Sequence, residues 1–160
     1  MKSKRTKPLI PDELSVFLES GLSIVVATRD GELQPNGAVA WALSVHDDRA
    51  HVSVFLHPDA AKEMLENLGS YPQIALDLDL PTSHRACQLK GLFVSARKAR
   101  APERAEVERQ LEAFSADLAA IGIPRALTAG WSSWPCTVLK VRVTDLFEQT
   151  PGPGAGDRLP

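Results

Sequence analysis

The run His57-Pro-Asp-Ala-Ala-Lys62 lies where an apolar strand pattern changes to a helix pattern. The first N–H groups of a helix have no intrahelical partner and carry the positive end of the helix dipole, so this turn suits a phosphate group. Lys62 would add a positive charge there. The alternative is a lysine that is only solvated, as at many strand-to-helix turns.

A second basic set follows a later strand boundary, at Arg85 and Lys90. An arginine can donate two parallel hydrogen bonds to a phosphate, which makes Arg85 a candidate ligand. The alternative for Arg85 is a surface ion pair with a neighbour such as Asp79. His84 and Cys87 form only half of a zinc pattern, so no metal site is expected. Cys87 lies in an apolar strand and is read as core rather than as a nucleophile.

Several common catalytic motifs are absent from the sequence. There is no G-x-G-x-x-G after a strand, no G-x-x-x-x-G-K-[ST] and no G-x-S-x-G. These absences argue against a Rossmann dinucleotide site, a nucleoside-triphosphate loop and a hydrolase nucleophile elbow. The residues alone therefore assign no catalytic group.

The composition is that of a single globular domain. The chain has 160 residues, a net charge of −2 and 44% apolar residues, with a pI of about 6.1. This balance argues against nucleic acid as a partner, because nucleic-acid-binding domains are usually strongly basic. Two cysteines cannot build a disulfide framework, which favours a reduced, cytoplasmic setting. No apolar run approaches the ~20 residues of a membrane span, and no leader sequence is expected.

The expected elements place these residues on a small antiparallel barrel. We expect a flexible basic N-terminus over 1–9, a domain over 10–149 and a flexible Pro/Gly-rich tail over 150–160. Apolar patterns predict a short helix that opens at Pro11–Asp12 and is capped by Gly21, helices over 58–68 and 102–121, and strands over 22–28, 34–45, 51–56, 73–80, 86–96 and 137–143. The links between strands are mostly short, which favours antiparallel pairing in a closed or half-closed barrel.

For some of these elements the residues also predict which way the side chains face or where the strand is irregular. Ile74, Leu76 and Leu78 alternate with polar residues and should face one way, whereas Gly91 marks a bulge or a close approach. The long helix should pack on the sheet through an apolar stripe, and Val138 should face opposite to its neighbours in the last strand. The stripe consists of Val107, Leu111, Phe114, Leu118 and Ile121.

In this order, the motifs resemble the pyridoxamine 5′-phosphate oxidase-like, FMN-binding split-barrel proteins. The hairpin Ala27-Thr-Arg-Asp-Gly31 with Pro35 resembles that family's opening. The run from Asn67-Leu68 through Tyr71-Pro-Gln-Ile-Ala-Leu76 and the strand Arg85-Ala-Cys-Gln-Leu-Lys-Gly91 resemble its later strands, and the Pro-Gly-rich ending after Phe147 resembles some members. The resemblance implies a mostly β protein with α-helices (α+β), a six-stranded antiparallel split β-barrel with a few flanking helices.

The resemblance also implies a homodimer with FMN between the two subunits. The phosphate turn would correspond to Ala60, Ala61 and Lys62, with alanines at positions where that family often carries a hydroxyl and an arginine. Tryptophans such as Trp41 or Trp134 could stack on the flavin ring. The cofactor-binding positions that the resemblance indicates are Val39, Trp41, Val54, Phe55, Leu56, Ala61, Lys62, Arg85, Gln88 and Lys90.

Two departures from the family bear on the substrate. The oxidases of vitamin B6 carry R-x-H near the C-terminus, where this chain has Asp157-Arg158-Leu159, and Trp131-Ser-Ser-Trp134 replaces the usual W-G-G. We therefore expect a flavin-dependent oxidoreductase acting on another small molecule. The alternatives are a non-catalytic flavin or haem-binding protein, or an interaction module with a degenerate site. A deazaflavin is a less favoured cofactor than FMN.

Overall fold

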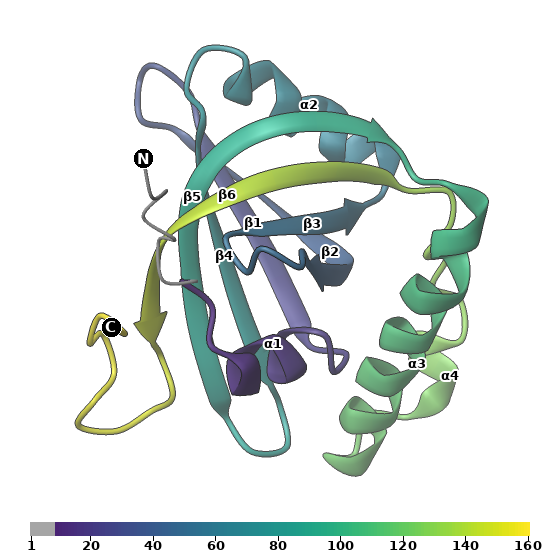
Figure 1. Cartoon of the computed structure of the whole chain (residues 1–160). Helices are drawn as coiled ribbons and strands as arrows, with labels where there is room; N and C mark the ends of the chain where they lie inside the picture. Colours follow the sequence, from purple (N-terminus) through teal and green to yellow (C-terminus); the bar gives the residue numbers. More distant parts are fainter. Residues whose placement is uncertain (1–8) are drawn as a thin grey trace.

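A computed structural model describes residues 9–160, and most of the predicted basic terminus lies outside the described residues. Six strands form the body of the chain (Figure 1). They are β1 (Ser23–Arg29), β2 (Pro35–Val45), β3 (His51–Leu56), β4 (Gln73–Leu80), β5 (Arg85–Lys98) and β6 (Thr137–Glu148). The helical elements are α1 (Asp12–Leu18), α2 (Pro58–Leu68), the 3₁₀ turn η1 (Ala101–Glu103), α3 (Arg104–Ala120) and α4 (Arg125–Thr128).

The strands close into a barrel in the order β1-β2-β3-β6-β5-β4, with β4 pairing back to β1. Every pairing is antiparallel. The predicted fold class, a six-stranded antiparallel barrel with flanking helices, is therefore confirmed. In this ring β2 and β5 lie on opposite sides, a placement that matters for the site.

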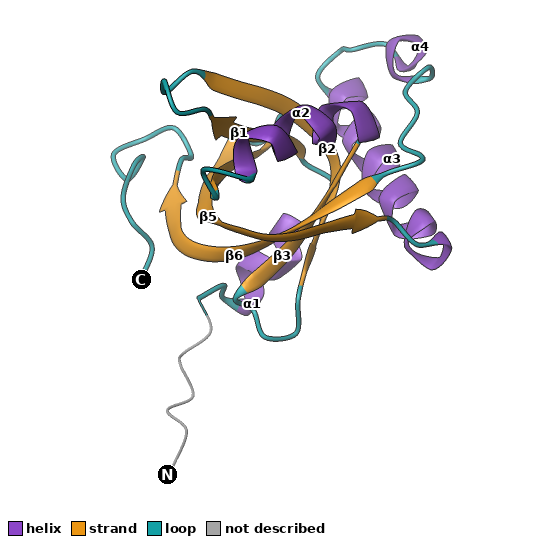
Figure 2. Cartoon of the chain, turned by 90° about the horizontal axis from the view of Figure 1, so that it is seen from above, coloured by secondary structure: helices purple, strands orange, loops and turns teal. Residues whose placement is uncertain are grey.

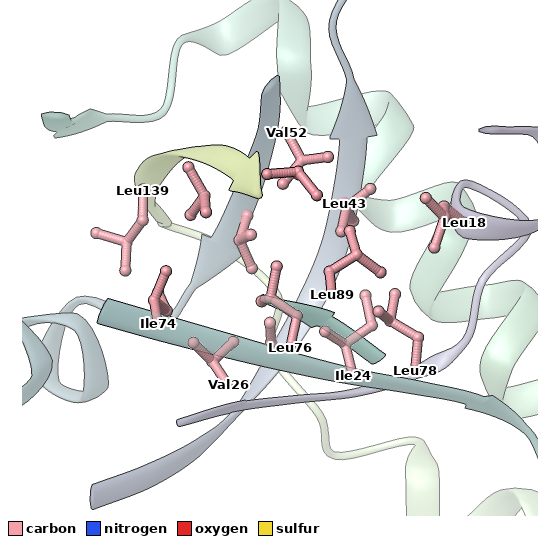
Figure 3. Close-up of a cluster of buried hydrophobic side chains, with 14 of the residues drawn as sticks. Leu18, Ile24, Val26, Leu43, Val52, Ile74, Leu76, Leu78, Leu89 and Leu139 are labelled. Atoms are coloured by element: carbon pink, nitrogen blue, oxygen red, sulfur yellow. The ribbon is translucent and has the colours of Figure 1, made fainter. Parts of the chain in front are cut away.

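The barrel is filled by one apolar side chain from every second residue of each strand. Ile74, Leu76 and Leu78 face inward as predicted and are at most 3% exposed. They meet Ile24 and Val26 of β1 in the cluster drawn in Figure 3. On β6, Val138 points out while Leu139 points in, as the sequence predicts.

Two short helices cover the open ends of the barrel. Leu14, Phe17 and Leu18 of α1 belong to the barrel core, and so do Ala61 and Met64 of α2. Seen from above, α2 lies across the ring of strands and α1 lies at the other end (Figure 2). The N-terminal turn of α2, and with it Lys62, is therefore held at one mouth of the barrel.

The long helix α3 lies outside the barrel, where β1 and β2 separate. The pairing of β1 with β2 stops at Ala40, next to a bulge. Beyond it, the Gln110 side chain accepts a hydrogen bond from Leu43 N at 3.1 Å and donates one to Leu43 O at 2.9 Å. Glu19 accepts another from Val45 N at 2.7 Å. These side chains replace the missing strand partner, because buried backbone groups need hydrogen bonds.

The predicted packing stripe of this helix is partly wrong. Val107 and Leu118 are buried, but the other buried positions are Gln110 and Ser115, and Ile121 is 49% exposed. An apolar count cannot find a glutamine that faces a strand edge. The helix itself begins at Arg104 after η1, two residues later than predicted, and the sequence patterns missed α4.

Strands β5 and β6 are longer than predicted and bend together around the barrel. Gly91 lies at a register shift between them, which confirms the expected bulge. A Cβ at this position would lie 2.5 Å from Arg142 O and 2.7 Å from Val141 Cγ1. Only glycine fits this close approach of two strands.

The residues after β6 fold back on the barrel. Leu159 N donates to Leu146 O at 2.8 Å, Gly156 N donates to Glu148 O at 2.7 Å, and Arg158 pairs with Asp145 at 2.6 Å. The segment forms turns and one isolated bridge rather than a regular strand. The flexibility expected for 150–160 stays a prediction, but these contacts attach the tail to β6.

Candidate functional site

The predicted phosphate turn begins α2. His57 caps this helix, with its Nδ1 accepting from Asp59 N at 3.3 Å. Lys62 is exposed and forms no ion pair with any described residue. The Ala61 side chain is fully buried in the barrel core. This turn therefore offers one free cation, and the Asp59 carboxylate in the first turn partly opposes it.

The strands predicted to face a flavin ring bring two aromatic side chains together on the outside of the barrel. Trp41 packs against a small outer cluster that contains Phe55, and its ring centroid lies 6.0 Å from that of Trp131. The cluster consists of Ala42, Phe55, Val107, Cys136 and Val138, with Trp41, Ala99 and Trp134 beside it. Val39 lies on the same strand as Trp41 and is 52% exposed.

One polar atom in this aromatic region lacks a partner. Trp41 Nε1 is buried and makes no hydrogen bond to any described residue. Such groups are rare in folded proteins, because burying an unpaired N–H costs about 1–3 kcal/mol. A bound molecule with a hydrogen-bond acceptor would satisfy this N–H group.

Three predicted site residues face the barrel interior. The side chains of Val54, Leu56 and Ala61 are each 0% exposed. Strand alternation explains the first two, because Phe55 between them faces outward. The structure leaves only backbone atoms of these three residues for contact with a ligand outside the barrel.

The basic residues of β5 do not form one group. The Arg85 guanidinium stacks over the Phe17 ring at 4.1 Å, at the α1 end of the barrel, rather than pairing with Asp79. Lys90 Nζ lies 5.0 Å from the Phe147 ring centroid. Gln88 and Lys90 alternate with Cys87 and Leu89, which are in the core, so they project outward.

Lys90 borders a groove of about 420 Å³ on the outer face of four strands. Two small residues of its lining, Ala27 and Ala75, pair across the sheet, and Ala75 also pairs with Lys90. The groove is lined by Ala27, Thr28, Arg29, Gln73, Ile74, Ala75, Lys90, Gly91, Leu92, Thr144 and Asp145.

A second pocket, of about 490 Å³, lies on the other side of the barrel beside Phe55. Sequence patterns did not single out its polar residues, because they come from β2, β3, β5 and η1, which are far apart in the chain. It is lined by Ser44, Val45, His46, Asp47, Ser53, Phe55, Arg97, Arg100, Pro102, Glu103 and Glu106. A third, of about 500 Å³, lies between α3, α4 and the Trp131–Trp134 loop.

The predicted site residues on the outer face therefore fall into two sets on different walls, with β2 of the first set opposite β5 of the second. Val39, Trp41 and Phe55 lie on β2 and β3, whereas Gln88 and Lys90 lie on β5. Outward side chains on opposite walls of a barrel diverge. One copy of the chain does not bring these two sets to one small ligand.

Both cysteines have the character of core residues. Cys87 and Cys136 are each 3% exposed. Burial raises the pKa of the Cys87 thiol to about 12 and that of Cys136 to about 11. A thiol in this state is a poor nucleophile, which confirms that Cys87 belongs to the core. Among residues 9–160, no three His, Cys, Asp or Glu side chains gather as a metal site, and no helix is long and apolar enough to cross a membrane.

Comparison with known proteins yields solved structures of low sequence identity. HupZ of Group A Streptococcus shares 17% identity over 92% of this chain and 99% of its own, with a TM-score of 0.56. An F420 reductase shares 17% identity over 86% of this chain and 98% of its own, with a TM-score of 0.53. A proposed pyridoxamine 5′-phosphate oxidase of Lactobacillus delbrueckii shares 15% identity over 89% of this chain and 96% of its own, with a TM-score of 0.52.

No protein-family model matches the sequence, and no curated protein matches it either. The likeness to the solved structures is therefore one of fold, and it extends over nearly their whole length. It agrees with the resemblance that the sequence motifs carry. The chain has the six-stranded barrel fold of the pyridoxamine 5′-phosphate oxidase-like proteins.

Proposed function

We propose that this protein binds a flavin, with FMN as the first candidate, between two copies of the chain and uses it to oxidise or reduce a small molecule. The fold supports the proposal, since similar structures include an F420 reductase and a proposed pyridoxamine 5′-phosphate oxidase. F420 is a deazaflavin, so a deazaflavin is the second candidate cofactor. The cytoplasmic setting stays a prediction from the sequence.

The separation of the two predicted residue sets is the observation that carries the proposal. Trp41 lies on β2, opposite β5 with Gln88 and Lys90, and Phe55 lies on β3, which is separated from β5 by β6. If both sets contact one flavin, a second copy must supply the β5 residues. Exposed Val25 and Val39, which are directly paired on β1 and β2, offer apolar surface for such an association.

The residues present fit a ring-shaped ligand that carries one phosphate. The unpaired Trp41 Nε1–H could donate to a ring carbonyl, and the free Lys62 ammonium could pair with a phosphate at the start of α2. Trp41, beside Phe55, provides an aromatic surface against which a flat ring could pack. A flavin, when bound, supplies hydride chemistry, and the protein supplies position and hydrogen bonds.

The absorption spectrum and native mass of the purified protein test this proposal directly. We expect flavin absorbance, or saturable quenching of added FMN fluorescence, together with a mass twice the 17.3 kDa chain. A colourless monomer that does not quench FMN fluorescence would refute both parts of the proposal.

The phosphate role of Lys62 can be separated from ring binding by comparing FMN with riboflavin, which lacks the phosphate. Lys62→Glu should weaken FMN binding about tenfold or more, which corresponds to about 1.4 kcal/mol, because it replaces an attractive charge by a repulsive one. Riboflavin binding should change little. Lys98→Glu, on the exposed end of β5, is the charge-matched control. An FMN affinity equal in the two variants would exclude Lys62 from the phosphate site.

A second candidate function is flavin binding without turnover. The observation that favours it is the pair Ala60 and Ala61, which leaves Lys62 as the only cationic side chain in the first turns of α2. Bleaching of the bound flavin by NAD(P)H, followed by reoxidation in air, would support an oxidoreductase. A bound flavin that neither reductant nor air alters would favour the binding protein.

A further inference from the structure

A small pocket on the outer face of the barrel is lined by basic groups and hydroxyls. It has a volume of about 220 Å³ and lies across β3, β6 and β5. Ser53 of β3 pairs in register with Lys140 of β6, and Lys140 pairs with Ser95 of β5. The lining consists of His46, Ser53, Ser95, Arg97, Arg100, Val138 and Lys140. Four of these seven residues are basic and none is acidic.

The nearest carboxylate neutralises only one of these cations. Glu103 binds Arg97 through two hydrogen bonds, of 2.8 and 2.5 Å, and also accepts from Arg100 N at 2.7 Å. Among the described residues, neither the Arg100 guanidinium nor the Lys140 ammonium forms an ion pair. Two positive charges therefore border the pocket without forming an ion pair, and the charge of Glu103 acts on Arg100 as well as on Arg97.

The pocket also contains hydrogen-bond donors that have no partner among the described residues. Arg97 has five N–H groups, and three are used by Glu103 and by Lys98 O. The Ser53 hydroxyl is fixed at 2.8 Å from His46 Nε2, and the residue is only 7% exposed. A polar group held in place at the base of a pocket reduces the entropy lost when a ligand is bound.

The positive charges around the pocket also affect the pKa of His46. Burial lowers the pKa of this imidazole, and the charges of Lys140, His51 and Arg97 lower it further, while Asp48 opposes them. Protonation of His46 is therefore disfavoured by neighbouring cations as well as by burial. An anion in the pocket would oppose the effect of the neighbouring cations and so raise the pKa of His46.

We propose that this pocket binds a phosphate-sized oxyanion, either free or as the acidic group of a small molecule. Arg100 and Lys140, which form no ion pair, supply positive charge for the anion, and the remaining Arg97 and hydroxyl donors suit its several oxygens. The adjoining 490 Å³ pocket shares His46, Ser53, Arg97 and Arg100, so it has room for the body of a larger molecule. The proposal does not depend on flavin, because Lys62 on α2 does not line this pocket.

Calorimetric titration with inorganic phosphate at fixed ionic strength tests the proposal. We expect saturable binding of one phosphate per chain. The double variant Arg100→Gln/Lys140→Gln should weaken it at least tenfold, because each change removes an unpaired charge. Arg104→Gln/Lys98→Gln has the same net charge, and neither of its residues lines the pocket, so it should bind phosphate as the unaltered protein does.

A second measurement reports from inside the pocket. Phosphate should raise the pKa of His46 in an NMR titration of the imidazole resonances, since the anion favours the imidazolium. His46 is faced by β6, β5, β3 and the β2–β3 turn through Lys140, Arg97, His51 and Asp48. The other charged residues that line a pocket with His46 are Asp47, Arg100, Glu103 and Glu106. The double variant should lose this phosphate-induced shift.

The source of the anion is decided by comparing free phosphate with a small phosphate monoester. Tighter binding of the ester would assign the pocket to an organic ligand that extends into the adjoining space, and equal or tighter binding of inorganic phosphate would assign it to the free ion. Absence of saturable binding of both, or equal weakening in the two double variants, would overturn the proposal. FMN binding is measured separately, so failure here leaves the flavin proposal standing.

Discussion

At the scale of single residues, hydrogen-bonding capacity decides more than residue type. Arg97 and Glu103 illustrate this, because the arginine uses three donors on its neighbours and keeps the rest facing a pocket. Trp41 is the opposite case, with one buried donor and no described partner. Both features depend on the positions of individual donor and acceptor atoms, which residue type alone does not give.

Stability should depend on pH through Glu103. Its hydrogen bonds to Arg97 lower its pKa from 4.5 to about 2 in the folded chain. The stabilisation is therefore complete above the unfolded-state value and is lost as the pH falls from about 4.5 through 2. Glu103→Gln should lower the urea midpoint at pH 7, and the difference from the unaltered protein should shrink towards pH 2.

The matched control for this prediction is Glu112→Gln. Glu112 forms an ion pair with Arg125, and its side chain is 69% exposed. Exposed pairs contribute little, so its urea midpoint should stay close to that of the unaltered protein at every pH. A Glu103→Gln deficit that is the same at pH 7 and pH 2 would contradict the assigned cause.

At the scale of elements, the separation of β2 from β1 determines where α3 packs. Beyond Ala40, the edge of β2 needs partners, and Gln110 supplies both a donor and an acceptor to Leu43. The helix is thus fixed by a polar contact that is only 1% exposed, with Val107 and Leu118 packing beside it. Its position in turn covers Phe55 and forms one wall of the outer pockets.

Gln110→Ala should destabilise the protein by about 2 kcal/mol, because it leaves a buried N–H and a buried C=O of Leu43 without partners. Urea denaturation measures this loss. Glu108→Ala on the exposed face of the same helix should stay within about 0.5 kcal/mol of the unaltered protein. Equal effects of the two changes would show that loss of helix side chains, and not the strand edge, is responsible.

At the scale of the whole molecule, the closed barrel determines where a ligand can bind. Its interior is filled by side chains, so ligands must bind outside. The outer wall carries an aromatic region at Trp41, a groove at Lys90 and a basic pocket at Lys140 that borders the aromatic region at Val138. The proposed flavin site joins the first to β5 of a second copy, whereas the proposed anion pocket is complete within one chain.

This difference gives a prediction about concentration. If two copies form the flavin site, diluting the protein until its native mass falls to that of one chain should release the flavin. The release would be followed by the recovery of flavin fluorescence. Phosphate binding in the pocket at Lys140 should persist in the dilute protein. Flavin that stays bound to the single chain would contradict the shared site.

The sequence predicted much of the fold, because local patterns report local burial. Alternation identified the strand around Leu76, and the bulge at Gly91 followed from a glycine inside a strand. In the turn after β1, Leu33 takes the left-handed conformation, with φ of 64°. Such a choice depends on the surrounding hydrogen bonds, including two that the Asp30 carboxylate accepts from Glu32 N and Gln34 N.

The sequence by itself determined the six antiparallel strands, three of the helices around them and the resemblance to flavin-binding barrels, since all three follow from the order of short motifs. Only the tertiary structure decided that Trp41 and Lys90 lie on opposite walls, that Gln110 replaces a strand partner, and that His46, Arg97 and Lys140 share a pocket. The physical reason is that the order of the strands in the ring and the register between them set which of these residues lie close together. Neither is encoded in the spacing of residues along any one segment.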